Sequence, residues 1–284
     1  MKNILTLFIL TSFFCLAFFS CDIIEPPYRE TVQVDTNATE YVRKVLIEEY
    51  TGFRCGNCPE AAEHAHKLAD FFKGKVFLLK VHAGYYAIPT NQYTYDFRIP
   101  EATELDKFFG CSKAGNPNGL ISRYGYPTKS HILRDQKWEE AIKNLLKEKP
   151  KMMINLNNSY EPLSREITTN VEIKFLEESK PNYALALYIV EDSIVQYQQD
   201  DRKRPPDVWD FVHDDILRGS MNGTWGTIIS DTPIPAGTTI QRQFKYVIPQ
   251  EKDWRPQHLK IMAFVHDHQV SYEIYQIEVK KIIQ

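Results

Sequence analysis

The pattern of hydrophobic and polar residues changes near residue 150. Before that point, apolar runs typical of strands alternate with stretches of helical period. The pattern predicts strands over residues 45–51, 75–82 and 119–122, and helices over residues 59–72, 101–109 and 136–148. The first strand, first helix and second strand together predict a βαβ unit. Residues 83–100, rich in Tyr, Pro and Asn, are expected to form a loop packed over the end of this unit.

After residue 150 the chain shows only strand patterns. The predicted strands span residues 152–160, 166–175, 183–192, 238–248, 259–266 and 272–280. In the second of these, apolar and polar residues alternate from Ile167 to Phe175, which is typical of a sheet with one face on a core. Two such sheets facing each other make a sandwich. We therefore expect an α/β domain over residues 41–150 and an all-β domain over residues 151–284.

The N-terminus has the pattern of an export signal. Lys2 precedes an apolar stretch over residues 4–19, which is short for a membrane span of about twenty residues. Ser20 followed by Cys21 resembles the lipobox of bacterial lipoproteins, in which the cysteine becomes the acylated N-terminus. We expect a signal peptide over residues 1–20 and a lipid-anchored tether over residues 21–40. The alternative is ordinary secretion with cleavage nearby.

Charge and cysteine content narrow the class of protein. The formal net charge is −3 with interspersed signs, which predicts no nucleic-acid partner. The basic run at residues 202–204 directly follows two aspartates and is expected to be a solvated loop. Beyond Cys21 the chain has only three cysteines, too few to staple a disulfide-rich scaffold. An exported protein held together by ordinary hydrophobic cores is therefore expected.

The candidate chemistry lies in the Cys-Gly-Asn-Cys sequence at residues 55–58, between a predicted strand and a predicted helix. A helix that starts there directs its free N–H groups and positive dipole end at a Cys55 thiolate and lowers the pKa of that thiol. Cys55 is then the candidate nucleophile. Cys58, one turn further along, is the candidate resolving thiol that releases a mixed disulfide.

An inert disulfide or a structural zinc site could use the same residue spacing. Zinc requires further ligands, and the only other cysteine past the leader is Cys111. His64 and His66, two residues apart on the predicted helix, point in nearly opposite directions and cannot bind one metal together. A redox dithiol is the favoured interpretation, and we expect no metal or other cofactor.

The order of these motifs resembles the thioredoxin superfamily. In that superfamily a cis-proline faces the active cysteines, and Pro117, directly ahead of the third predicted strand, is the matching position; an ordinary prolyl turn is the alternative. The superfamily also places a buried acid six residues before the first cysteine, which here is Glu49. The resemblance implies that Glu49 takes the proton of the resolving thiol, whereas an exposed or salt-bridged Glu49 is the competing view. Arg54 stands where the superfamily usually has Trp.

Across most of its length the chain more narrowly resembles the twenty-eight-kilodalton outer membrane protein family of Bacteroidetes lipoproteins. The resemblance rests on residues 51–59, 82–84, 95–98, 116–119, 211–213 and 223–226. It implies a lipid-anchored protein with a thioredoxin-like α/β domain followed by an all-β immunoglobulin-like sandwich. It also implies a place in the cell envelope at the outer membrane.

These features predict a membrane-anchored thiol-disulfide oxidoreductase that acts on thiols or disulfides of exported proteins. Cys55 attacks, Cys58 resolves, Glu49 carries a proton and Pro117 shapes the substrate groove. The alternative is a non-catalytic outer membrane lipoprotein that binds a partner through its β domain, because a fold does not imply its best-known activity. The sequence predicts neither the direction of electron flow nor an oligomeric state.

Overall fold

The computed structural model describes residues 41–128 and 130–283. The predicted signal peptide, Cys21 and the tether over residues 21–40 lie outside the described residues. The short 3-10 helices are η2 (Tyr85–Ala87), η3 (Ser112–Ala114), η4 (Asp135–Lys137) and η5 (Pro256–His258).

The predicted βαβ unit is present at the start of the described chain. Strand β1 (Val45–Thr51), helix α2 (Cys58–Phe71) and strand β2 (Val76–His82) follow one another, and β1 and β2 pair in parallel. Strand β3 (Asn118–Ile121) pairs antiparallel with the other edge of β1. Pro59 lies in the first turn of α2, where its missing N–H costs no hydrogen bond.

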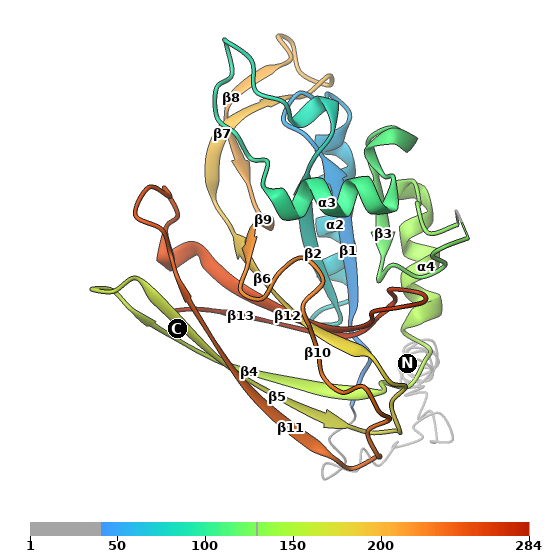
Figure 1. Ribbon diagram of the computed structural model, residues 1–284. Helices are drawn as coiled ribbons and strands as arrows, with labels where there is room; N and C mark the ends of the chain where they lie inside the picture. Colours follow the sequence, from blue (N-terminus) through green and yellow to red (C-terminus); the bar gives the residue numbers. More distant parts are fainter. Residues whose placement is uncertain (1–40, 129, 284) are drawn as a thin grey trace, which may run out of the picture. The chain divides into compact units, whose positions relative to one another are not determined.

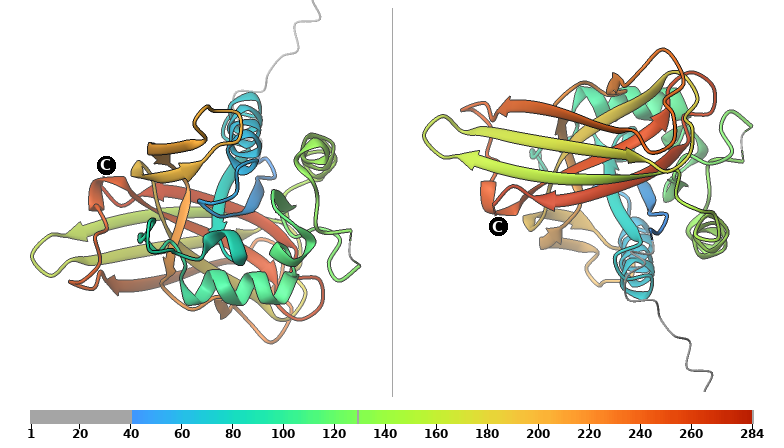
Figure 2. Two further views of the ribbon diagram at one scale, coloured as in Figure 1. Left: turned by 90° about the horizontal axis from the view of Figure 1, so that it is seen from above. Right: turned by 90° about the horizontal axis from the view of Figure 1, so that it is seen from below.

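Helices cover both faces of these strands. Alternate residues of β1 point to opposite faces, so Val45 and Ile47 pack with α2 and α4 (Trp138–Leu145). Leu46 and Tyr50 pack on the other face with α3 (Pro100–Phe109). Figure 2 shows the strands between α2 on one side and α3 on the other. All seven residues of β1 are consequently buried.

The second half of the chain consists of strands. The six predicted strands correspond to β4 (Met152–Glu161), β5 (Glu166–Phe175), β6 (Tyr183–Glu191), β11 (Thr239–Val247), β12 (Leu259–Asp267) and β13 (Ile274–Lys281). Four further strands were not predicted: β7 (Ile194–Gln199), β8 (Asp207–His213), β9 (Ile216–Ser220) and β10 (Thr227–Ile228). Strands β7 and β8 pair with each other as a separate antiparallel hairpin.

One sheet joins strands from the two halves of the sequence. Its order is β13-β12-β6-β9-β2-β1-β3, with β10 paired to β6. The junction is the parallel pairing of β2 with β9, where Lys80 lies opposite Ile216. Residues 41–284 accordingly form one compact unit in which β9 lies beside the βαβ unit. Figure 1 shows this continuity.

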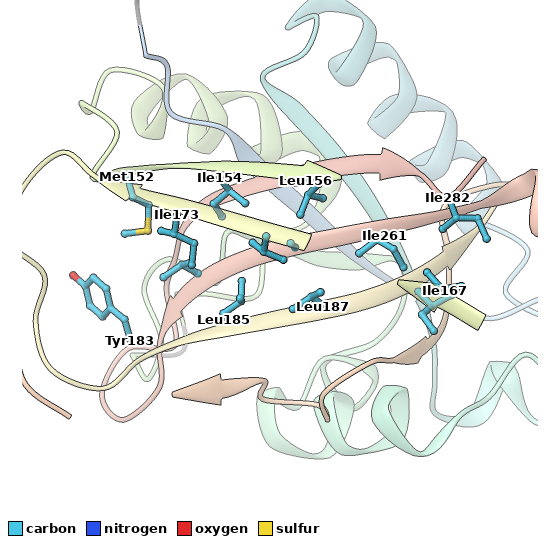
Figure 3. Close-up of a cluster of buried hydrophobic side chains, with 14 of the residues drawn as sticks. Met152, Ile154, Leu156, Ile167, Ile173, Tyr183, Leu185, Leu187, Ile261 and Ile282 are labelled. Carbon is cyan, nitrogen blue, oxygen red and sulfur yellow. The ribbon is translucent and has the colours of Figure 1, made fainter. Parts of the chain in front are cut away.

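Strand β6 connects two hydrophobic cores, and every one of its residues is buried. Leu185 and Leu187 point toward the three-stranded sheet β11-β5-β4. Ala186 and Tyr188 point the other way, into the core that includes α3. Figure 3 shows Ile154, Leu156 and Ile173 of the smaller sheet meeting Leu185, Leu187 and Ile261 of the larger one. The fold is therefore β-rich, with two sheets packed face to face and helices around one end of the larger sheet.

Candidate functional site

The two cysteines of the motif form a disulfide at the junction of β1 and α2. The Cys55–Cys58 sulfur atoms are 2.06 Å apart. The Cys55 N–H donates to the Gly52 carbonyl at 2.9 Å, and the Cys58 N–H donates to the Cys55 carbonyl at 3.1 Å. Cys55 is only 4% exposed and Cys58 1%. The pair is thus at the predicted place, but little of it reaches the solvent.

Glu49 lies on β1 with its side chain on the α2 face, the same face as Val45 and Ile47. It is 2% exposed, and neither carboxylate oxygen has a hydrogen-bond partner among the described residues. Burial raises the pKa of Glu49 from 4.5 to about 7, and the positive charge of Lys80 opposes that increase. Glu49 is therefore a buried acid whose pKa lies near neutrality, not an exposed or salt-bridged one.

A series of ionisable groups leads from Glu49 toward the surface. Lys80 on β2 is in register with Glu49 and is 6% exposed. Its Nζ lies 3.3 Å from His66 Nε2, and that nitrogen is 3.9 Å from Asp215 Oδ2. Burial, followed by the charge of Lys80, lowers the pKa of His66. Nothing in the spacing of His64 and His66 along the sequence indicated this contact.

Pro117 lies beside the end of β1, because the next residue, Asn118, pairs with Tyr50. The Asn116–Pro117 bond is cis, as expected. The Pro117 carbonyl accepts a hydrogen bond of 2.7 Å from Arg134 Nη1. Pro117 and the disulfide therefore lie at the same end of the sheet.

The β7–β8 hairpin lies against the cysteine motif, as Figure 1 shows at the N-terminal end of α2. The Gln199 N–H donates to the Phe53 carbonyl at 2.8 Å, and the Asp201 N–H donates to the Gly56 carbonyl at 2.9 Å. Gln198 Nε2 donates to the Cys55 carbonyl at 3.2 Å. Residues 202–204 are exposed, as the sequence predicted, but nothing in their pattern indicated that the hairpin would reach the motif.

An aromatic cluster packs against the base of this hairpin, which consists of the paired strands β7 and β8. Phe53, Phe97 and Tyr197 are buried together, and Tyr93 stacks on Tyr197 with ring centroids 3.6 Å apart. Asp207 Oδ1 accepts hydrogen bonds from Tyr93 at 3.0 Å and from Tyr197 at 2.7 Å. A small cavity of about 150 Å³ opens between Tyr93, Tyr197 and Trp209. The base of the hairpin is therefore anchored by side-chain packing.

Two buried histidines, His82 and His213, adjoin the aromatic cluster. Their ring centroids are 5.8 Å apart. Burial lowers the pKa of His213 to about 3 and the pKa of His82 well below its usual value. Both imidazoles are therefore neutral at physiological pH. His213 is the last residue of β8, one of the strands that the sequence pattern did not predict.

Cys111, the third cysteine of the described residues, takes no part in the disulfide. Cys111 is a free, buried thiol, and burial raises its pKa. Over residues 41–128 and 130–283, no group of His, Cys, Asp and Glu side chains has the arrangement of a metal site. None of the helices in this part of the chain is long and apolar enough to cross a membrane.

More than half of the chain matches one known protein family. The model of the family described as Outer membrane protein Omp28 matches residues 102–284. The chain belongs to the Omp28 family. Membership confirms the resemblance seen in the sequence and places the protein in the cell envelope, at the outer membrane.

Solved structures similar to this Omp28-family chain agree on the fold. HBP35 of Porphyromonas gingivalis matches 85% of this chain and 76% of that chain, at 17% identity and a TM-score of 0.64. Protein AGR_C_4864 from Agrobacterium tumefaciens matches 87% of this chain and 97% of that chain, at 14% identity and a TM-score of 0.51. No curated protein matches the chain. At these identities the likeness concerns the fold alone.

Proposed function

We propose that this Omp28-family protein is a membrane-anchored thiol-disulfide oxidoreductase that acts on exported proteins through Cys55 and Cys58. The observation that carries the proposal is Glu49, a buried acid without a hydrogen-bond partner on the strand that leads to the motif. Leaving a carboxyl group buried and unpartnered costs stability, and such groups are concentrated at functional sites.

Glu49 is suited to transfer a proton to or from Cys58. Strand β1 runs toward the motif, and α2 begins at Cys58 and packs on the face of β1 that carries Glu49. The acid therefore lies behind the N-terminal end of the helix. With a pKa of about 7 it is present in both protonation states near neutral pH, as a general acid-base group requires.

The exchange starts from the disulfide that the structure contains. A substrate thiolate attacks Cys55 Sγ, the Cys55–Cys58 bond breaks, and the leaving Cys58 sulfur takes the proton of Glu49. A second substrate thiolate then attacks the substrate sulfur of the mixed disulfide and releases Cys55 as a thiolate. The substrate dithiol loses two electrons, and the Cys55–Cys58 pair gains them. The reverse sequence reduces a substrate disulfide, with a dithiol protein as the electron donor that restores the pair.

The arrangement of elements supports a thioredoxin-like interpretation of residues 41–150. A parallel β1-α2-β2 unit, an antiparallel β3 and Pro117 beside the end of β1 are the parts that this interpretation requires. For residues 151–284, two sheets facing each other support an immunoglobulin-like sandwich. We retain these two regions as the proposed units of the fold, joined through the β2–β9 pairing.

Catalysed reduction of insulin disulfides by glutathione tests the proposed function. The wild-type protein is expected to accelerate the reaction, and Cys55→Ser is expected to abolish the acceleration. Cys111→Ser is the matched control, because that thiol is buried outside the motif and should leave the rate unchanged. A wild-type protein without turnover in this assay, or one equally active after Cys55→Ser, would contradict the proposal.

A second candidate function is favoured by the burial of both cysteines. In this alternative the chain is a non-catalytic lipoprotein that binds a partner through its β-sandwich region, and the disulfide only fastens the β1–α2 junction. Membership in the Omp28 family fits this alternative without further assumptions. The same assay separates the two candidates, because a structural disulfide gives no turnover.

A further inference from the structure

The part of the β7–β8 hairpin that covers the disulfide is its tip, residues 200–206. Gly56, between the two cysteines, has no side chain, and a Cβ at that position would overlap the carboxyl group of Asp201. The Asp201 N–H also bonds to the Gly56 carbonyl. The tip therefore lies directly on the dipeptide that separates the two cysteines.

Polar contacts fasten the tip to helix α2. Arg202 forms a bidentate pair with Glu63 of α2, with nitrogen–oxygen distances of 2.9 and 2.7 Å. The same guanidinium also bonds to Asp200 at 2.9 and 2.8 Å, so one arginine links the tip to itself and to the helix. Residues 201–205 are exposed, and such a solvated ion pair contributes little free energy.

Buried side chains hold the base of the hairpin in place, whereas polar contacts hold the tip. Ile194 and Tyr197 belong to a buried aromatic cluster with Phe53 and Phe97, and Tyr197 also bonds to Asp207. Removing this base would expose apolar surface, whereas lifting the tip would break hydrogen bonds and one exposed ion pair. The tip, which lies beyond the last paired residues Gln199 and Asp207, is therefore the part of the hairpin that moves at the lowest free-energy cost.

We propose that the hairpin tip is a cover over the Cys55–Cys58 disulfide, which an extended segment of a protein substrate displaces in order to reach Cys55. Displacement of the tip frees the carbonyl of Gly56, which now accepts a hydrogen bond from the Asp201 N–H, whereas the Gln199 N–H of β7 keeps its bond to the Phe53 carbonyl. The displacing segment bonds a main-chain N–H of its own to the Gly56 carbonyl, as extended peptides do when they bind through main-chain hydrogen bonds. This inference rests on the proposed function, because it names how that site is closed and what opens it.

The test compares the rate of reduction of the disulfide by glutathione in proteins with and without the tip. Replacing residues 200–206 by an Asn-Gly turn joins Gln199 to Asp207, which already pair, and leaves the aromatic base intact. We expect reduction at least about tenfold faster, because the hydrogen bonds that close the cover are gone.

Two single substitutions test the cover without shortening the chain. Arg202→Ala removes the bond to Glu63 and should accelerate reduction about two- to fivefold, the range expected for an exposed ion pair. Arg204→Ala is the matched control, because Arg204 bonds only to carbonyls within the tip. High salt should accelerate reduction of the wild type but not of Arg202→Ala, because salt screens the Arg202–Glu63 pair.

Equal reduction rates in the wild-type and tip-shortened proteins would overturn the cover, whatever the activity of either protein. Faster reduction of the shortened protein supports the cover. If that protein still fails to reduce insulin, the cover stands and the proposed oxidoreductase function fails. Circular dichroism and the melting temperature of each variant confirm that the fold is retained.

Discussion

Glu49 and Lys80 lie opposite each other on the parallel strands β1 and β2, and both side chains are buried. The opposite charge of Lys80 lowers the pKa of Glu49, but burial raises it by more, and the result is about 7. An acid with this pKa makes the stability of the protein depend on pH. In the proposed function, Glu49 is also the proton carrier of the site near neutral pH.

The free energy of unfolding should change with pH as Glu49 titrates. Its pKa is higher in the folded than in the unfolded protein, so between about pH 4.5 and 7 the folded state binds more protons and stability falls as pH rises. The difference of about 2.5 pKa units corresponds to a loss of about 3 kcal/mol. In Glu49→Gln this loss is absent.

Urea unfolding of the wild-type protein and of Glu49→Gln, from pH 4.5 to 8, measures this dependence of stability on pH. His213 and His266, whose pKa values burial lowers to about 3, change stability in the opposite direction, because the unfolded state takes up their protons as pH falls. They do so equally in both proteins, so the difference between the two curves isolates Glu49. Curves that stay parallel over this range would show that Glu49 titrates normally.

The buried Arg123–Glu48 pair on the other face of β1 should contribute to stability but not to redox chemistry. Its two hydrogen bonds are 2.8 and 2.7 Å long, and both side chains are fully buried. Arg123→Met leaves the Glu48 charge without its partner and should cost about 3–5 kcal/mol of unfolding free energy.

Double substitution separates the charge from the packing at this pair. Glu48→Leu combined with Arg123→Met should recover part of the stability lost in Arg123→Met alone, because no unpaired charge remains. Lys143→Met, which breaks an exposed pair with Glu139, is the control and should leave unfolding unchanged. A double variant that loses as much unfolding free energy as Arg123→Met and Glu48→Leu added together, each measured alone, would contradict this interpretation.

Cys58→Ser should trap substrates on Cys55. Without the resolving thiol, a mixed disulfide formed by Cys55 persists and is seen as a reducible adduct in cell-envelope extracts separated without reductant. Combining Cys58→Ser with replacement of residues 200–206 by the Asn-Gly turn should increase the yield. Cys55→Ser with Cys58→Ser is the control, and adducts of equal abundance in that protein would show that Cys55 is not the nucleophile.

Acylation of Cys21 is a proposal about a residue outside the described range. Cys21→Ser should remove lipid from the protein and move it from the outer membrane fraction to the soluble fraction. Radiolabelled fatty acid incorporation measures the first effect, and immunoblots of separated membranes measure the second. A Cys21→Ser protein that still carries label and stays in the membrane would place the anchor elsewhere.

Local pattern was sufficient to predict the strands that build the two cores. Strands β1 and β5 begin and end at the residues that alternation and apolar runs predicted, because both bury side chains at regular spacing. The cysteine motif likewise lies between a strand and a helix, where local sequence placed it.

The β7–β8 hairpin could not be predicted from the same pattern. Strands β7 and β8 are short and partly polar, and their stability depends on contact with Phe53 and Phe97, which are more than ninety residues earlier in the chain. The tip has the composition of a solvated loop, and only the fold brings Arg202 against Glu63. The burial of Glu49 also depends on packing that the sequence left open.

The reduction potential of the Cys55–Cys58 pair tests the central claim most directly. Equilibration with defined ratios of reduced to oxidised glutathione, followed by alkylation and mass measurement, gives the potential of the wild-type protein. Redox-active dithiol proteins span about −270 to −120 mV, and the proposed oxidoreductase should fall in that range. A potential below about −300 mV would mark a structural disulfide and contradict the account.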